Sequence, residues 1–127
     1  LYGQTMPMRM VARLGHEVAR ALDKKCIFAE KQDGKLVLRR FSILPGEPVI
    51  VAEDVVTRGG RVQETVDIVK QHGGRVLAIA TLVDRSAGTA DFGGIPHFSL
   101  LQMSPVTWEP AQCPHCARGS KPMHPGS

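Results

Sequence analysis

Two continuous apolar runs separated by one amphipathic segment constrain the fold of this chain more than any other feature. The runs, at residues 48–52 and 75–83 (RVLAIATLV), are apolar on both faces, as in parallel strands that helices cover on both sides. Between them, residues 62–71 carry valines at helical spacing, and Gly73-Gly74 is typical of a helix end. Strand, glycine turn, helix and strand make a βαβ unit. The sequence therefore predicts an α/β, Rossmann-like fold with a mostly parallel sheet flanked by helices.

The remaining segments predict shorter elements around this unit. Apolar residues at spacings of three, four and one favour an amphipathic helix over 10–22. Segments 26–29 and 35–41 read as extended on either side of a polar Asp-Gly turn, so they form a hairpin or a flexible loop. We expect a short third strand at 97–101 and a surface tail over 104–127, which is rich in Pro, His and Gly.

Length and composition limit the class of protein. The 127 residues have room for one domain, 1–127, and no apolar run reaches the roughly 18 to 20 residues that cross a bilayer. Three cysteines and the lack of a secretory leader pattern favour a reducing cytoplasm. The net charge of +4 suits an anionic ligand, while one Trp, one Tyr and four Phe offer no stacking platform. We expect no nucleic-acid partner and no membrane partner.

Glu53 and Asp54 follow the first apolar run directly. Ligands of open α/β sheets bind beyond the carboxyl ends of the strands, which is where these side chains are expected. Adjacent carboxylates in an apolar setting need a cation, hydroxyl donors or solvent, because they repel one another when both are ionised. The vicinal diol of a ribose, with or without Mg²⁺, meets that need. A solvated strand end or a helix N-cap is the simpler alternative.

A glycine-containing loop follows this acidic pair. Val55 and Val56 lead into Thr57-Arg58-Gly59-Gly60-Arg61, which opens the predicted helix. Free backbone N–H groups and the helix dipole favour an anion there, and glycine lets the backbone approach it closely. Diol acceptors beside a phosphate cradle predict a site for a ribose 5-phosphate.

These residues also carry a family resemblance. The stretch VIVAEDVVTRGG resembles the phosphoribosyl-pyrophosphate (PRPP) signature of type I phosphoribosyltransferases. VQETVDIVKQHGGRVLAIATLVDRSAG and the final CPHCARGSKPMHPGS are similar to orotate phosphoribosyltransferases in particular. The resemblance covers residues 14–127. It implies the type I phosphoribosyltransferase fold and the Mg²⁺-dependent transfer of ribose 5-phosphate from PRPP to orotate, in the cytoplasm, by a homodimer whose subunits share their sites.

The resemblance also implies roles for single residues. Asp54 and Lys31 would be catalytic, with Lys31 and Lys35 on a mobile loop that closes over pyrophosphate. Thr57 and Arg85 would contact orotate. The residues implied to bind PRPP are Glu53, Asp54, Val55, Val56, Thr57, Arg58, Gly59, Gly60, Arg61, Lys31 and Lys35.

The chain departs from the family near its start. Residues 7–11 (PMRMV) stand where the family has a Pro-x-x-Gly-Gly loop that contacts pyrophosphate, and the family's substrate-covering hood is absent or incomplete. We therefore expect a truncated paralogue, a fragment, or a sequence from which segments have been dropped. The alternative functions are a non-catalytic PRPP- or nucleotide-binding module and a purine phosphoribosyltransferase.

Other residues keep simpler interpretations open. Arg85 can pair with Asp84 or Asp91 on a surface loop, and the lysines can be the polar side of a hairpin. The pair in Cys113-Pro-His-Cys116 has the spacing of half a zinc site, of a redox pair or of a plain surface feature. Cys26 is interpreted as a small buried hydrophobe inside an apolar strand.

Overall fold

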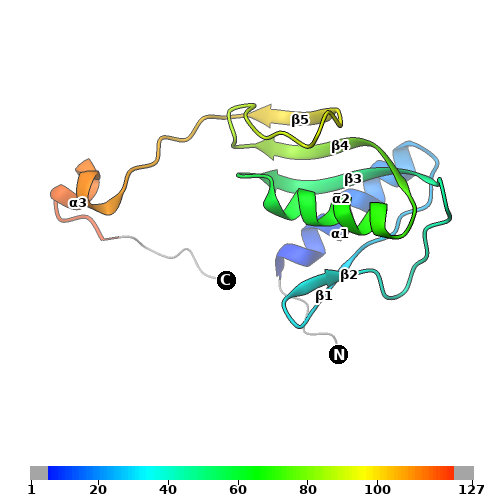
Figure 1. Ribbon diagram of the computed structural model, residues 1–127. Coiled ribbons are helices and arrows are strands. Elements are labelled where there is room, and N and C mark those ends of the chain that lie inside the picture. The colour runs from blue at the N-terminus through cyan, green and yellow to red at the C-terminus, as the bar shows by residue number, and fades with distance from the viewer. Residues whose placement is uncertain (1–5, 122–127) are drawn as a thin grey trace.

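A computed structural model describes residues 6–121 (Figure 1). In chain order, the elements are α1 (Met6–Ala21), β1 (Glu30–Gln32), β2 (Lys35–Val37), β3 (Pro48–Val56), α2 (Gly60–Gln71), β4 (Arg75–Asp84), β5 (His97–Gln102), the 3-10 helix η1 (Pro110–Gln112) and α3 (Pro114–Ala117). Within the described residues no helix is long and apolar enough to cross a membrane. Figure 1 shows α2 in front of the main sheet and α1 behind it.

The main sheet confirms the predicted parallel arrangement. Three strands lie in the order β3-β4-β5, and both neighbouring pairs are parallel. The predicted βαβ unit is therefore present as β3, α2 and β4. Glu53 pairs in register with Thr81, which in turn pairs with Ser99 of β5. The acidic pair is thus held by a ladder that runs across the whole sheet.

The end of β3 corrects one expectation. The strand was expected to stop after Ala52, so that Glu53 and Asp54 would follow it; in the structure it continues to Val56. The reason is that Val55 and Val56 remain paired with β4, opposite Val83 and Asp84. The two carboxylates therefore lie inside the strand, and their side chains point to opposite faces of the sheet.

The hydrophobic core lies between the sheet and α2. Val51 and Ile79 come from the sheet and Val66 from the helix, and Val66 and Ile79 have no exposed surface. Burying each such side chain contributes roughly 1.5–3 kcal/mol. At the end of α2, Gly73 is left-handed with φ 82°, and the N–H of Gly74 donates to the carbonyl of Val69. The predicted glycine end of this helix is confirmed.

The hairpin is confirmed in a shorter form. β1 and β2 are antiparallel, and Asp33 and Gly34 make the turn with φ of 49° and 84°. Segment 26–29 forms no strand, which corrects the expectation that Cys26 lies inside one. This segment is held by side-chain contacts instead, such as the edge-to-face contact of Phe28 with Phe41.

The first helix begins earlier than its apolar pattern predicts. α1 starts at Met6 and lies against β3, so residues 7–11 are helical where the family resemblance places a loop. A proline in the first turn is compatible with a helix, because the N–H that it lacks has no partner there. Pro7 therefore starts the helix without disturbing it.

Candidate functional site

Glu53 and Asp54 form the acidic centre of the site. Glu53 is only 7% exposed, whereas Asp54 is half-buried. Burial, the neighbouring Asp54 charge and a hydrogen bond with Asp54 raise the pKa of Glu53 to about 7. The pair therefore holds a proton readily near neutral pH, and a ligand that supplies positive charge or hydroxyl donors would displace it.

The loop after β3 has the backbone of an anion site. Gly59 is left-handed with φ 81°, and its carbonyl accepts the first helical hydrogen bond, from the N–H of Gln63 at 2.9 Å. A Cβ at Gly59 would lie 3.0 Å from the Phe92 ring, so conformation and packing both require glycine. A concavity of about 40 Å³ is lined by the loop, including Gly60 and Arg61, at the N-terminus of α2. The N–H groups of this first turn have no partner within the helix.

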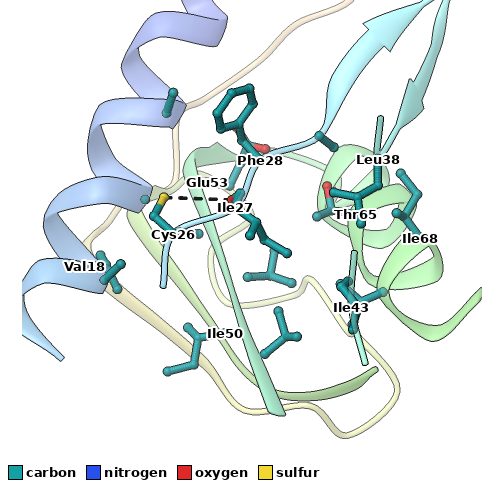
Figure 2. Close-up of a pocket in the computed structure, with 18 of the residues that line it drawn as sticks. Val18, Cys26, Ile27, Phe28, Leu38, Ile43, Ile50, Glu53, Thr65 and Ile68 are labelled. Carbon is teal, nitrogen blue, oxygen red and sulfur yellow. Dashed lines mark hydrogen bonds between the residues drawn. The ribbon is translucent and has the colours of Figure 1, made fainter. Parts of the chain in front are cut away.

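A larger cavity joins these two features. Its volume is about 1000 Å³, and it lies between α1, the segment that leads to the hairpin, β3 and α2. Figure 2 shows Val18 and Cys26 on one side of it, and Thr65 and Ile68 of α2 on the other. Its size is at the upper end of the roughly 300–1,000 Å³ of small-molecule sites.

This cavity brings together several of the residues proposed from the sequence. Its lining contains Glu53, Asp54, Val55, Thr57, Arg61 and Lys31. Lys31 comes from β1, so the cavity joins a hairpin cation to an acidic pair and an anion loop that lie far from it in the sequence. Lys35, Arg58 and Arg85 do not line it. Their proposed roles stay predictions.

Arg85 lies next to the phosphate loop through its backbone. Its N–H donates to the carbonyl of Val56 at 2.7 Å, and its side chain is exposed. Among the described residues it forms no ion pair with Asp84 or Asp91. The Asp84 carboxylate accepts instead from the Ser86 N–H and hydroxyl, at 2.7 and 2.6 Å. The side chain of Arg85 is therefore not committed to either neighbouring carboxylate.

Asp84 shows how the end of β4 is held in place. The residue is 2% exposed, and burial alone raises its pKa, but the hydrogen bonds from Ser86 outweigh that effect and leave the pKa below its usual value. Its main-chain carbonyl also accepts from Met103. Asp84 therefore serves as an anchor for the loop that begins with Arg85.

Two contributors to the site were not found by sequence reasoning. Phe92 is buried and packs on Gly59, so it supports the phosphate loop from a segment more than thirty residues away. Its signal in the sequence is an aromatic residue within a loop of small residues. Glu64 accepts a hydrogen bond from the Leu36 N–H at 3.0 Å. No pattern marks it, because the bond joins a helix to a hairpin.

The cysteine pair near the C-terminus does not gather a metal site among residues 6–121. No group of three or more potential metal ligands occurs in that range. The Sγ of Cys113 accepts from the N–H of Cys116 at 3.4 Å, and the His115 ring contacts Trp108 edge-on. His124, named above as a neighbour of the pair, lies outside the described residues. Zinc binding and redox activity stay untested predictions.

The fold and the site define a phosphoribosyltransferase. Residues 5–110 match the phosphoribosyl transferase domain, and the chain belongs to this family. An adenine phosphoribosyltransferase from Thermoanaerobacter pseudethanolicus shares the fold with a TM-score of 0.55 at 18% identity, covering 70% of this chain and 63% of that one. A second, from Rhodothermus marinus, gives 0.52 at 21% identity, with 72% and 63% covered.

The sequence relatives are more specific. The orotate phosphoribosyltransferase of Heliobacterium modesticaldum is 49% identical over 115 residues, and that of Acidithiobacillus ferrooxidans is 46% identical. The matches cover 90% of this chain, but 60% and 59% of these relatives. The chain thus spans about three fifths of the length of the curated relatives that it matches.

Proposed function

We propose that this chain acts in orotate phosphoribosyl transfer, the Mg²⁺-dependent transfer of ribose 5-phosphate from PRPP to orotate. The products are orotidine 5′-monophosphate and pyrophosphate, in the biosynthesis of UMP. The observation that carries the proposal is the single cavity lined by the acidic pair, Thr57, Arg61 and Lys31. The identity of about 45–49% to orotate phosphoribosyltransferases supports orotate as the base.

The acidic pair suits the ribose and a magnesium ion. Glu53 and Asp54 offer oxygen ligands of the kind that Mg²⁺ prefers, and the Glu53 carboxyl, with a pKa raised to about 7, loses its proton when positive charge approaches. When bound with PRPP, Mg²⁺ neutralises charge on the pyrophosphate leaving group. The residues themselves accept hydrogen bonds from the two ribose hydroxyls and fix the sugar in place.

The remaining groups surround the reacting carbon. Residues 57–61 hold the 5-phosphate at the N-terminus of α2, and the Lys31 ammonium stabilises charge on the departing pyrophosphate. Thr57 and the guanidinium of Arg85 bind orotate, whose carboxylate suits a guanidinium fork. Catalysis then rests on orientation and electrostatic support of an oxocarbenium-like centre, and no covalent nucleophile is required.

The test is conversion of orotate by the purified chain with PRPP and Mg²⁺, followed by orotate absorbance. We expect Asp54→Asn to lower kcat/KM by about a hundredfold or more, because the change removes a charge beside the sugar while keeping its shape. Asp67→Asn, on the exposed side of α2, is the matched control and should leave turnover unchanged. Equal activity of wild type and Asp54→Asn would contradict the proposal.

Two alternatives have distinct outcomes in the same assay. A non-catalytic PRPP-binding module is favoured by the helical residues 7–11, which replace a glycine loop, and it predicts saturable PRPP binding without turnover. A purine phosphoribosyltransferase predicts turnover of adenine or hypoxanthine in preference to orotate. Comparison of the three bases therefore separates all three functions.

Assembly and setting complete the proposal. We propose a cytoplasmic homodimer built on one domain, 1–127, with 104–127 as a surface tail. The proposal is supported by three free cysteines, by the exposed residues 103–109 and by the exposed β5 side chains Phe98 and Leu100. Sedimentation equilibrium at micromolar concentration tests it, and a monomer at all concentrations would contradict it.

A further inference from the structure

The outer edge of the hairpin is attached to α2 by one side chain. In the register of the hairpin, Leu36 lies opposite Lys31. The Leu36 N–H donates to Oε1 of Glu64 at 3.0 Å, so it points away from β1. In an antiparallel pair, residues whose N–H groups point outward form the non-hydrogen-bonded positions, where facing side chains lie closest. Glu64 therefore holds the backbone directly opposite Lys31.

The hairpin has little else to fix its position. Each strand has three residues, and a two-stranded hairpin of this size is marginally stable alone. The Glu30–Arg40 ion pair, at 3.3 Å, joins two residues that both belong to the hairpin and its flanks. The bond to Glu64 differs because it reaches a rigid element, and it is half-buried.

That rigid element is the one that carries the anion loop. α2 begins at Gly60, so Glu64 lies one helical turn after the proposed phosphate site. Leu36 and Lys31 both line the cavity that also contains Glu53 and Asp54. A single carboxylate thus connects the phosphate end of the site to the hairpin that supplies its lysine.

We propose that Glu64 is a positioning residue, whose carboxylate fixes the hairpin on α2 so that Lys31 faces the acidic pair and the phosphate loop. The inference rests on the proposed function for its catalytic consequence, but the placement of the hairpin stands apart from it. Glu64 acts through Leu36 and Lys31 and touches no substrate. Removing its acceptor frees the hairpin to move, whereas exchanging its charge for an amide keeps an acceptor oxygen in place.

The first test is amide hydrogen exchange of the chain without substrate. Glu64→Ala should speed exchange of the Leu36 N–H by about tenfold or more, because that donor loses its partner. Glu64→Gln should restore most of the protection. Asp67→Ala is the control, since it removes a carboxylate of the same helix that bonds only Gln63, at 2.8 Å. Unchanged Leu36 exchange in Glu64→Ala would overturn the inference, whether or not the chain is active.

The second test is kinetic. Glu64→Ala should lower kcat about tenfold with a smaller change in the KM for PRPP, because Lys31 acts on charge that develops in the transition state. In a Lys31→Ala background the same change should have no further effect, since nothing remains to be positioned. Losses that multiply in the double variant would overturn the inference. A wild type without turnover would instead overturn the proposed function, and Leu36 exchange would still decide the role of Glu64.

Discussion

At the scale of single residues, the ionisation of Glu53 links the stability of the protein to its proposed chemistry. Its pKa is raised from 4.5 to about 7 by burial and by the charge of Asp54. Between these values the folded state binds more protons than the unfolded state, so the free energy of unfolding falls as pH rises from 4.5 to 7 and stays low above 7. A group placed for stability alone would not be buried next to a second carboxylate.

We expect Glu53→Gln to remove this pH dependence. The amide has nearly the shape of the protonated carboxyl, so the variant and the wild type should unfold at similar denaturant concentrations at pH 5. At pH 8 the variant should be more stable by up to about 3 kcal/mol, because it has no buried charge to accommodate. Urea unfolding at several pH values between 5 and 8 measures the difference. Parallel stability profiles for the two proteins would contradict the assigned cause.

The two acids could be proposed from the sequence, whereas their surroundings could not. An acidic pair between an apolar run and a glycine loop indicates a ligand site at any burial. The continuation of β3 to Val56 depends on pairing with Val83 and Asp84, which is a contact between distant segments. For the same reason the burial of Glu53, and hence its raised pKa, belongs to the tertiary structure.

At the scale of elements, the turn between β3 and α2 gives its two glycines different roles. Gly59 has φ 81°, and a Cβ there would lie 3.0 Å from Phe92, whereas Gly60 has open space around it and no positive φ. We expect Gly59→Ala to lower the free energy of unfolding by about 1–3 kcal/mol, from backbone strain and overpacking. Gly60→Ala should change it by less than about 1 kcal/mol, because alanine suits a helix.

Denaturant unfolding of the two variants side by side checks this prediction. A larger loss in Gly60→Ala than in Gly59→Ala would show that the turn has a different backbone. The sequence could not rank the two glycines, since the left-handed residue depends on where α2 begins. Nor could it exclude a strand at 26–29, where apolar side chains pack on neighbouring segments without any ladder of hydrogen bonds.

At the scale of the whole molecule, burial is uneven on the two faces of the sheet. The face toward α2 holds the core, with Ile79 of the central strand fully buried, while Leu100 of β5 is 84% exposed. The parallel sheet and its central strand followed from apolar runs, since burial on both faces leaves a mark in the sequence. The exposure of β5 did not, because an apolar side chain looks the same in a sequence whether or not it is covered.

This asymmetry predicts opposite sensitivities in two strands that are neighbours in the sheet. Ile79→Val removes one methyl group from a fully packed position and should lower the free energy of unfolding by about 1 kcal/mol. Leu100→Ala removes three heavy atoms but should change it by less than about 0.5 kcal/mol, because the side chain already contacts water. Urea unfolding at low micromolar concentration measures both. If the Leu100 change cost more than the Ile79 change, the outer face of β5 would have to be covered in solution, and the same variant examined by sedimentation would show whether a second copy of the chain covers it.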